Sequence, residues 1–474
     1  MHQPPHPISN SPRRGLSWLI TVVVLTSACP AKKRAPVPKT PSPEASKGSA
    51  KGDHVVGAVK SGAKGLKKAG VKSDAKGVKQ PSPKSDDPKS DNPKSDDGAS
   101  SQAPEGGGVD FIADARLLYE VAACPGQRQP KVCGFDARVL KTHCQRLRSQ
   151  MVRYRKVYVD KARPFLTALA PKDLPTRVVY PFGGGDLLTA LTTYAHAQEI
   201  TTISLEHVGD VRGVRRLRGR KLAGNLKTLR QTIGGLLALS DSTSVNMMKM
   251  QRTPIPGQLA FFLTALAIYD LEPVSLRYFS IEASGKLHYY TKEEIAGLDK
   301  KRAKRLSGGW VDPTGSPAFS NAEMTFRRRG DPKAPLIIHR HVAANLANSR
   351  LPATGPLLVH LGAKGPFVAM TKAAAYMIWR RDFSHLRDLL LKKMVYMVSD
   401  STGIPPSHLK AHGFQVTTFG RYSQCFFEKR FNPKTDEQFV RLWRRQRYHR
   451  LPFRYGYPDR KGHWHMMIAK KVRH

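Results

Sequence analysis

The stretch that most restricts the fold of this chain is Val178–Tyr194, VVYPFGGGDLLTALTTY. The sequence predicts a short apolar strand over Arg177–Phe182, a turn at Gly183–Gly185 and a helix that begins at Leu187. A second strand is expected within Glu199–Asp210, EITTISLEHVGD. Strands that alternate with glycine turns and helices are typical of parallel sheets. The sequence therefore predicts an α/β fold with a mixed sheet built from Rossmann-like strand, glycine turn and helix units.

A second block repeats this order. In PLLVHLGAKG, which begins at Pro356, we expect a strand over Leu357–Leu361 followed by a glycine turn and a long helix. The strand MVYMVSD then ends at Asp400. The carboxyl ends of parallel strands meet at one edge of a sheet, and ligands bind there. The candidate ligand-binding residues are therefore those that follow the strands: Gly183, Gly184, Gly185, Asp186, Glu206, Asp400 and Ser401.

The glycine turn has some features of a nucleotide site and lacks others. About twenty residues separate Gly183 from Glu206, the spacing at which a Rossmann unit places the carboxylate that binds a ribose. Three consecutive glycines do not form the G-x-G-x-x-G fingerprint, however. Asp186 stands where a side chain caps a helix and accepts bonds from the N–H groups that an anion would need. We expect Asp186 to act mainly as a cap and expect no cofactor; a nucleotide-type cofactor is the alternative.

The start of the chain has the pattern of an exported protein. Arg13 and Arg14 precede the apolar run GLSWLITVVVLT, which is typical of a cleaved signal peptide. The next residues, TSAC, resemble the lipobox of bacterial lipoproteins. That resemblance implies a signal peptide over residues 1–28, a lipid on Cys29 and, because Pro30 replaces the aspartate that marks inner-membrane retention, an outer-membrane anchor facing the periplasm. The alternative is an ordinary cleaved signal or a short membrane anchor.

Residues 29–108 have a composition unlike that of a folded domain. They are rich in Lys, Ser, Pro, Gly and Asp, and they include the run PKSDDPKSDNPKSDD. Segments with so few large apolar side chains do not bury a core, so we expect a disordered tether. Residues 109–474 are expected to form a single α/β domain. Apolar residues at helical spacing predict that this domain opens with helices over 110–123 and 135–169.

The charge of the chain indicates what it attracts. Lys plus Arg number 79 and Asp plus Glu 36, which gives a formal net charge of +43. A basic protein of the envelope is attracted to anionic lipids and polymers, so we expect partners of that kind besides the membrane that holds the anchor. Basic clusters lie at 212–221, 300–305 and 441–450. Because no zinc-finger spacing or RNP-like pattern occurs, we expect no specific nucleic-acid binding.

Cysteine usage predicts disulfide bonds. Four cysteines remain beside Cys29, and an exported chain lies in an oxidising compartment. The segment CPGQRQPKVC encloses a short loop, so we predict a bond between Cys124 and Cys133, which leaves Cys144 for Cys425.

No metal site is expected. The cysteine spacings lack the close pairs of structural zinc sites. His339 and His341 alternate along one predicted strand, and the HWH run repeats this pattern at His463 and His465. Since no third ligand has a matching spacing, we interpret these histidines as solvent-facing.

Several blocks carry a resemblance to known proteins. They resemble the recurring blocks of a family of bacterial secreted proteins and lipoproteins of uncharacterised function. In chain order they read YPFGGGDLLTALTTY, TTISLEHVGD, DSTGIPP, FGRYSQ and FRYGYPDRKGHWHMMIA. The resemblance covers most of the chain from about residue 110 onward and implies one folded unit, but no activity, substrate or cofactor. Relatives of this family carry a second acid in DSTG; this chain has Ser401, which weakens a two-carboxylate mechanism.

Two classes of function stay open. The preferred one is a lipid-anchored envelope protein whose α/β domain binds an anionic or sugar-like ligand without catalysis. The other is an enzyme: a hydrolase that uses Asp186, Glu206 or Asp400 as acid or base, or a Rossmann-like enzyme that binds a nucleotide or S-adenosylmethionine. No G-x-S-x-G elbow indicates a serine hydrolase. Two acids in an open pocket would favour the enzyme, and carboxylates engaged in caps and ion pairs would favour the binding protein.

Overall fold

The computed structural model describes residues 107–472, apart from 129, 131, 239–248, 251–252, 300–315, 373, 423–432 and 457–461. All described residues belong to one compact unit. The signal segment, Cys29, the tether up to residue 106, the basic cluster at 300–305 and Cys425 therefore lie outside the described residues.

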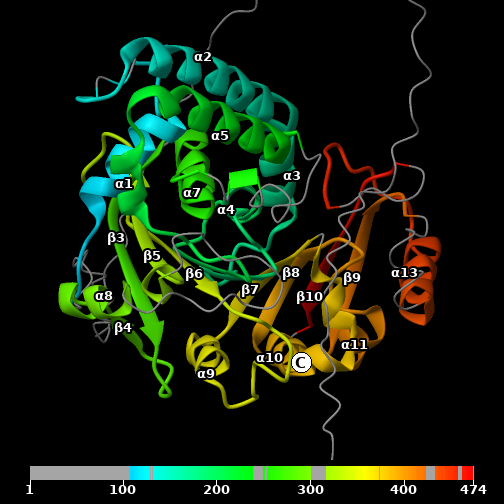
Figure 1. Ribbon diagram of the computed structural model, residues 1–474. Coiled ribbons are helices and arrows are strands. Elements are labelled where there is room, and N and C mark those ends of the chain that lie inside the picture. Colours follow the sequence, from blue (N-terminus) through cyan, green and yellow to red (C-terminus); the bar gives the residue numbers. More distant parts are fainter. Residues whose placement is uncertain are drawn as a thin grey trace, which may run out of the picture. The chain divides into compact units, whose positions relative to one another are not determined.

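A mixed sheet of ten strands forms the centre of the domain, in the order β4-β3-β5-β6-β2-β1-β7-β8-β10-β9 (Figure 1). The strands are β1 Arg177–Pro181, β2 Glu199–Ser204, β3 Leu271–Ile281, β4 Leu287–Tyr289, β5 Ala322–Arg328, β6 Ile337–Ala343, β7 Phe367–Thr371, β8 Met394–Ser399, β9 Phe414–Gly420 and β10 His465–Lys471. Strands β6, β2, β1, β7 and β8 pair in parallel, and the outer strands pair antiparallel. The prediction of an α/β fold with a mixed sheet is confirmed.

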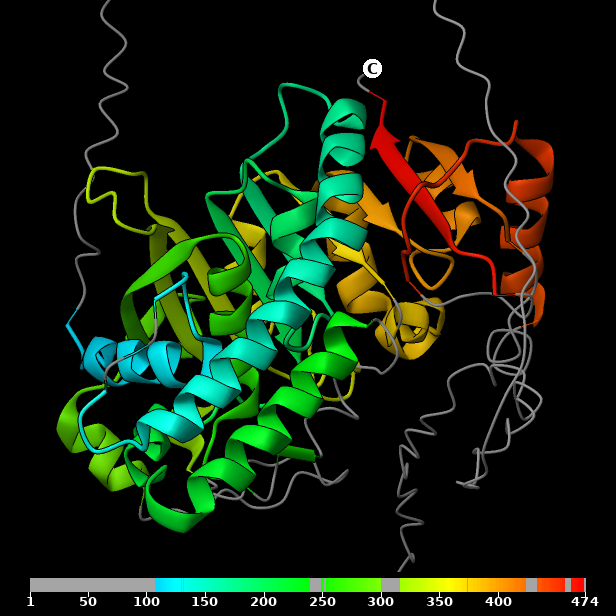
Figure 2. The same cartoon turned by 90° about the horizontal axis from the view of Figure 1, so that it is seen from above.

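Helices cover both faces of this sheet (Figures 1 and 2), and each face has its own apolar core. The first layer holds α1 Ile112–Leu118, η1 Tyr119–Ala123, α2 Ala137–Tyr154, η2 Arg155–Val159, α3 Asp160–Leu169, α4 Leu187–Thr193, α5 Leu222–Leu237 and α7 Gly257–Ile268. The second holds α9 Pro356–Ala363, α10 Ser384–Lys393, α11 Pro406–Ala411 and α13 Pro433–Arg445. The remaining elements are η3 Val211–Arg216, η4 Gly219–Lys221, α8 Lys292–Asp299, η5 Pro317–Phe319, η6 Ala374–Trp379 and η7 Arg381–Phe383. Helices precede the first strand, as the sequence predicts.

The five parallel strands follow a doubly wound order. Numbered along the chain, they lie side by side as 3-2-1-4-5, because β6 and β2 flank β1 on one side and β7 and β8 flank it on the other. Helix α4 connects β1 to β2 over one face, and α10 connects β7 to β8 over the other. In such sheets the ligand crevice lies where the winding changes direction, at the carboxyl ends of the central strands. Here that place is between β1 and β7.

The second strand, glycine turn and helix unit begins later than predicted. Leu357–Leu361 is not a strand but part of α9, and Pro356 fills the first helical position, where proline is favourable. The strand is β7, which follows a turn at Gly365 with φ +71°. A short apolar run does not by itself distinguish a strand from a helix, which explains the error.

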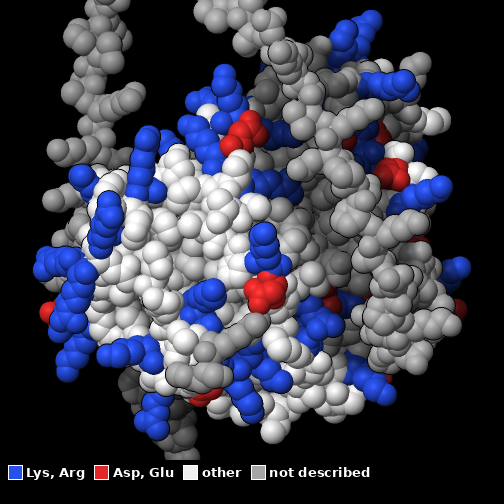
Figure 3. All heavy atoms as spheres, turned by 180° about the vertical axis from the view of Figure 1, so that it is seen from behind, with Lys and Arg blue, Asp and Glu red and all other residues white. Residues whose placement is uncertain are grey.

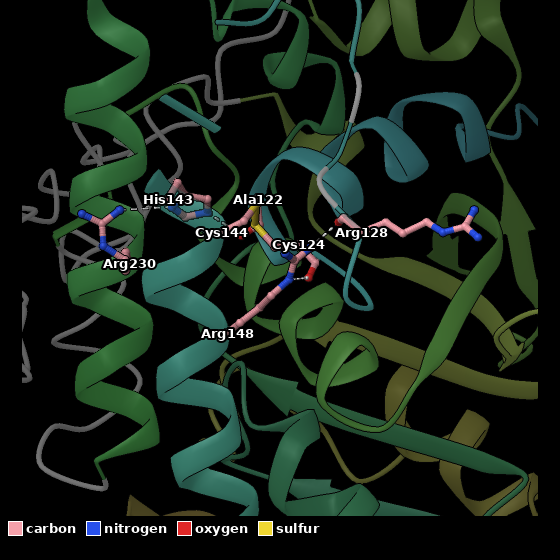
Figure 4. Close-up of a disulfide and its surroundings, with 7 residues drawn as sticks. All are labelled: Ala122, Cys124, Arg128, His143, Cys144, Arg148 and Arg230. Carbon is pink, nitrogen blue, oxygen red and sulfur yellow. Dashed lines mark hydrogen bonds between the residues drawn. A yellow bond between two sulfur atoms is a disulfide. The ribbon is translucent and has the colours of Figure 1, made fainter. Parts of the chain in front are cut away.

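The disulfide bond also differs from the prediction. Cys124 is bonded to Cys144 rather than to Cys133, and the two Cα atoms lie 5.4 Å apart (Figure 4). The predicted bond between Cys144 and Cys425 is therefore wrong as well. Cys144 belongs to the buried side of α2, together with Leu140 and Leu147, and this side faces Cys124 at the end of η1. Cys133 has a free, exposed thiol. The prediction was wrong because it weighed only the length of the closed loop, not the helix face on which each cysteine lies.

Replacing Cys144 by serine is expected to lower the free energy of unfolding by about 2–4 kcal/mol, because it opens a covalent loop in the unfolded chain. Cys133→Ser is the matched control and should leave stability unchanged. Denaturant unfolding measures both variants. Peptide mass spectrometry of the oxidised protein should recover a peptide that links Cys124 to Cys144; recovery of a Cys124–Cys133 peptide would contradict the assignment.

Candidate functional site

The carboxyl edge of the parallel strands gathers most of the predicted site residues. Phe182–Asp186 follow β1, Lys372 follows β7, and Asp400–Gly403 follow β8. His465 lies at the same edge because it begins β10, which runs antiparallel to β8. We therefore take this edge, beside the switch between β1 and β7, as the candidate site.

The glycine turn is packed against the protein's own aromatic rings. A Cβ atom at Gly183 would lie 2.9 Å from the ring of Tyr180, and one at Gly185 would lie 2.7 Å from Cδ2 of Phe261 on α7. Gly184 has φ +52°, a conformation that favours glycine. All three glycines are buried. At Gly183 and Gly185 the rings of Tyr180 and Phe261 therefore fill the space that the missing side chains leave. A ligand that contacts the backbone of this turn would need the same space.

Asp186 is the N-cap of α4, which confirms the interpretation of this residue as a cap. Its Oδ1 accepts bonds from the backbone N–H of Thr189 at 3.1 Å and from the Thr189 hydroxyl at 2.7 Å. Its Oδ2 accepts a bond from the Tyr180 hydroxyl at 3.1 Å and pairs with Nζ of Lys372 at 2.5 Å. Both oxygens of this buried carboxylate are therefore engaged.

The turn after β8 is held in a similar way. Oδ1 of Asp400 accepts bonds from the backbone N–H of Thr402 at 2.9 Å and from its hydroxyl at 2.5 Å. The backbone of Gly456 presses on the other side, since a Cβ there would lie 2.0 Å from Oδ2 of Asp400. The Ser401 hydroxyl lies 2.8 Å from Nε2 of His465, and both side chains are buried.

Two tyrosines join the carboxylates. Burial raises the pKa of Tyr180 and of Tyr455 well above the ordinary value of 10, and the negative charges of Asp186 and Asp400 raise both pKa values further. The two phenols therefore stay protonated. The structure thus brings Asp186 and Asp400 to the same group of tyrosines, as the sequence predicts for residues at strand ends.

Glu206 lies on the β6 side of this edge, where its backbone carbonyl accepts a bond from Nε2 of His341 at 2.8 Å. The interpretation of His339, His341 and His465 as solvent-facing is wrong, because all three are buried. The hydroxyl of Thr202 lies 2.9 Å from Nε2 of His339 and 2.9 Å from Nδ1 of His341. Burial lowers the pKa of His341 to about 4 and that of His339 well below 6.5, so both rings are neutral and bind neighbouring strands together.

Lys372 and Tyr455 are the residues of this edge that sequence reasoning missed. Lys372 directly follows the apolar strand β7 in the run FVAMTK. A lysine directly after an apolar strand indicates a residue at the carboxyl edge of the sheet. We expected the strand at Leu357–Leu361 instead, so Lys372 was not identified as the residue at a strand end. Tyr455 has no such signal, since its place beside Asp400 depends on the path of the chain before β10.

The contacts of Asp186 and Asp400 favour a structural role for these carboxylates over acid–base catalysis. Asp186 and Asp400 accept hydrogen bonds from groups within three residues of themselves, and Asp186 has a cation as well. Across the part of the chain that the structure describes, no three His, Cys, Asp or Glu residues are grouped so that they could hold a metal ion. No helix among those residues is long and apolar enough to span a bilayer. Neither the models of protein families nor the curated proteins include a match to this chain.

Proposed function

We propose that this chain is a lipid-anchored protein of the bacterial envelope, facing the periplasm, whose α/β domain binds an anionic or sugar-like component without catalysing a reaction. The observation that carries the non-catalytic part is the packing of the carboxyl edge. Tyr180 and Phe261 fill the space beside the glycines, and Lys372 neutralises Asp186. A hydrolytic mechanism needs two carboxylates directed at a substrate, whereas Asp186 binds Tyr180, Thr189 and Lys372 and Asp400 binds Thr402.

Charge supports an anionic partner. The chain has a formal net charge of +43, and on the face seen in Figure 3 Lys and Arg are far more frequent than Asp and Glu. A surface of this kind concentrates polyanions near the protein without any specific pocket. The lipobox-like TSAC and Cys29 support the anchor, and the basic domain would then work close to a membrane.

A second candidate is an enzyme that binds a nucleotide or S-adenosylmethionine. It is favoured by the doubly wound order of the parallel strands, with a glycine turn after β1 and Glu206 after β2. The contacts at Gly183 and Gly185 weigh against it, because the aromatic rings occupy the approach that a cofactor would use.

Thermal melts test the two candidates. A soluble polyanion or a wall fragment should raise the melting temperature of the wild type, and NAD and S-adenosylmethionine should not. Gly185→Ala should cost about 1–3 kcal/mol of stability, because the new Cβ overlaps Phe261, and should keep the polyanion effect. Gly224→Ala, in a helix with open space around it, is the control and should be neutral or stabilising. A cofactor that stabilises the wild type but not Gly185→Ala would favour the enzyme.

Palmitate labelling that is equal in the wild type and Cys29→Ser would refute the anchor.

A further inference from the structure

We infer that the outward side of the helical run α2–η2–α3 docks onto a bilayer surface that carries anionic lipid headgroups. The inference rests on the proposed function, because it names the partner and the contact surface of the envelope-binding domain. We call this side the α2 face. It consists of the exposed residues between Ala137 and Leu169.

The α2 face is long and faces away from the sheet. Helix α2, η2 and α3 follow one another without a break from Ala137 to Leu169, and α5 packs alongside α2, as seen from above in Figure 2. Residues that recur every three or four positions, such as Leu147, Met151 and Tyr154, are buried against the domain. Most of the positions between them are exposed and lie on the side of the run that is turned away from the domain.

The charge of this face is almost purely positive. Asp160 is the one acidic residue between Ala137 and Leu169. Seven cations are exposed on the run: Arg138, Lys141, Arg146, Arg153, Arg155, Lys156 and Lys161. None of the seven forms an ion pair with another described residue. Helix α5 adds Lys227 and has no acidic residue at all. Asp160 is therefore the only acid on the face against seven cations, and an anionic surface would neutralise the remaining positive charge.

Exposed apolar side chains distinguish a bilayer from a soluble polyanion. Val152 is 62% exposed, Val157 51% and Leu169 37%. They supply three of the six large apolar side chains that are exposed among the described residues; the other three are Leu205, Tyr448 and Val472. A polymer of phosphates or sugars gains little from such groups, whereas the boundary between headgroups and acyl chains takes up apolar side chains that are flanked by Lys and Arg. The cations of this face would contact anionic headgroups, and the valines beside them would contact the boundary between headgroups and acyl chains.

An anchored protein would use this face as its second membrane contact. A basic surface is a common second membrane contact of lipid-anchored proteins. The anchor would keep the domain at a high local concentration near the headgroups, so that a face of modest intrinsic affinity is occupied for most of the time.

Vesicle co-sedimentation of residues 29–474 carrying Cys29→Ser, which lack both the apolar signal segment and the lipid, tests the inference. The vesicles contain phosphatidylcholine alone or phosphatidylcholine with phosphatidylglycerol. The parent protein should bind only the anionic vesicles. Arg146→Glu with Arg153→Glu and Lys156→Glu should weaken binding by about tenfold or more, since three cations become anions at the contact. The matched control reverses three exposed cations of the α13 region, Arg444→Glu, Arg445→Glu and Arg447→Glu, and should bind within about twofold of the parent.

The double variant Val152→Ser and Val157→Ser leaves the charge unchanged and should weaken vesicle binding several-fold. Thermal melts establish that each variant is folded. The inference is overturned if the α2-face charge variant binds like the parent, if the α13 control loses as much, or if the valine variant loses nothing, which would indicate a soluble polyanion as the partner. If the parent ignores anionic vesicles while a soluble polyanion still raises its melting temperature, the inference fails and the proposed function stands; if neither has an effect, both fail.

Discussion

Replacing Asp186 by alanine is expected to lower the free energy of unfolding by about 3–5 kcal/mol, the cost typical of breaking a buried ion pair by removing one partner. The reason is that Lys372 would keep its charge in a mostly buried place without a counter-ion. The hydroxyl of Tyr180 and the backbone N–H of Thr189 would lose their acceptor as well. Denaturant unfolding of the purified domain at neutral pH measures the effect.

Two further variants separate the parts of this effect. Asp186→Asn keeps a side chain that caps helices well and removes the charge, so it should lose less than the alanine variant. Lys372→Met in the Asp186→Asn background removes the orphaned cation and should restore part of the loss. An Asp186→Ala protein that is more stable than the wild type would contradict the structural role, because a carboxylate kept at a cost to stability is the mark of an active site.

Acid is expected to destabilise the domain strongly between pH 6.5 and pH 4. Burial lowers the pKa of His143 and of His341 to about 4 and that of His339 well below 6.5. The contacts explain why the rings stay neutral. Nδ1 of His143 lies 3.3 Å from a guanidinium N–H of Arg230 and must accept, while its Nε2 donates to the carbonyl of Ala122 at 3.1 Å (Figure 4).

The sign of the effect follows from proton binding. As the pH falls through 6.5, these histidines take up protons in the unfolded chain but not in the folded one, so the free energy of unfolding falls until about pH 4. Above pH 7 both states are neutral and the contribution is fully present. At pH 5, His143 and His341 should each cost about 2 kcal/mol relative to neutral pH, and His339 adds a cost in the same direction.

Urea unfolding at a series of pH values measures this slope. His143→Gln should flatten the dependence on pH in that window, because an amide can still donate to Ala122 and accept from Arg230 but does not titrate. His412→Asn, at an exposed position, is the control and should leave the dependence unchanged. A free energy of unfolding that stays constant from pH 7 to pH 5 would contradict the neutral, buried state of these rings.

The parts of the fold that the sequence predicts correctly are those with local causes. The glycine turn and the cap at Asp186 define the end of β1 and the start of α4 within a few residues. The α2 helix has a strong apolar period, and Cys144 falls on its buried side, so the correct disulfide partner was within reach of the same reasoning. The strand assigned to Leu357–Leu361 failed because Pro356 starts a helix there.

The parts that the sequence did not predict depend on distant segments. The ring of Phe262 on α7 covers His339 and His341, with 4.4 and 5.4 Å between ring centroids. No residue near the two histidines in the sequence indicates this contact, so we interpreted them as surface residues. Phe261 from the same helix fills the space at Gly185. Whether the glycine turn is open or packed therefore depends on α7. The sequence of the turn itself does not indicate that this helix lies beside it.

The long segment of chain between β2 and β6 affects how the protein folds. These two strands are neighbours in the sheet, yet the bonded pair Thr202 and His341 is 139 positions apart in sequence. Strand β6 pairs with β2 only after α5, α7 and the antiparallel strands β3 to β5 have been synthesised, and contacts of such long range are slow to form. Until then the open edge of β2 is a template for pairing with another chain. The delay before β6 pairs with β2 is therefore a period in which the chain is exposed to aggregation, and the stability of the finished domain does not shorten it.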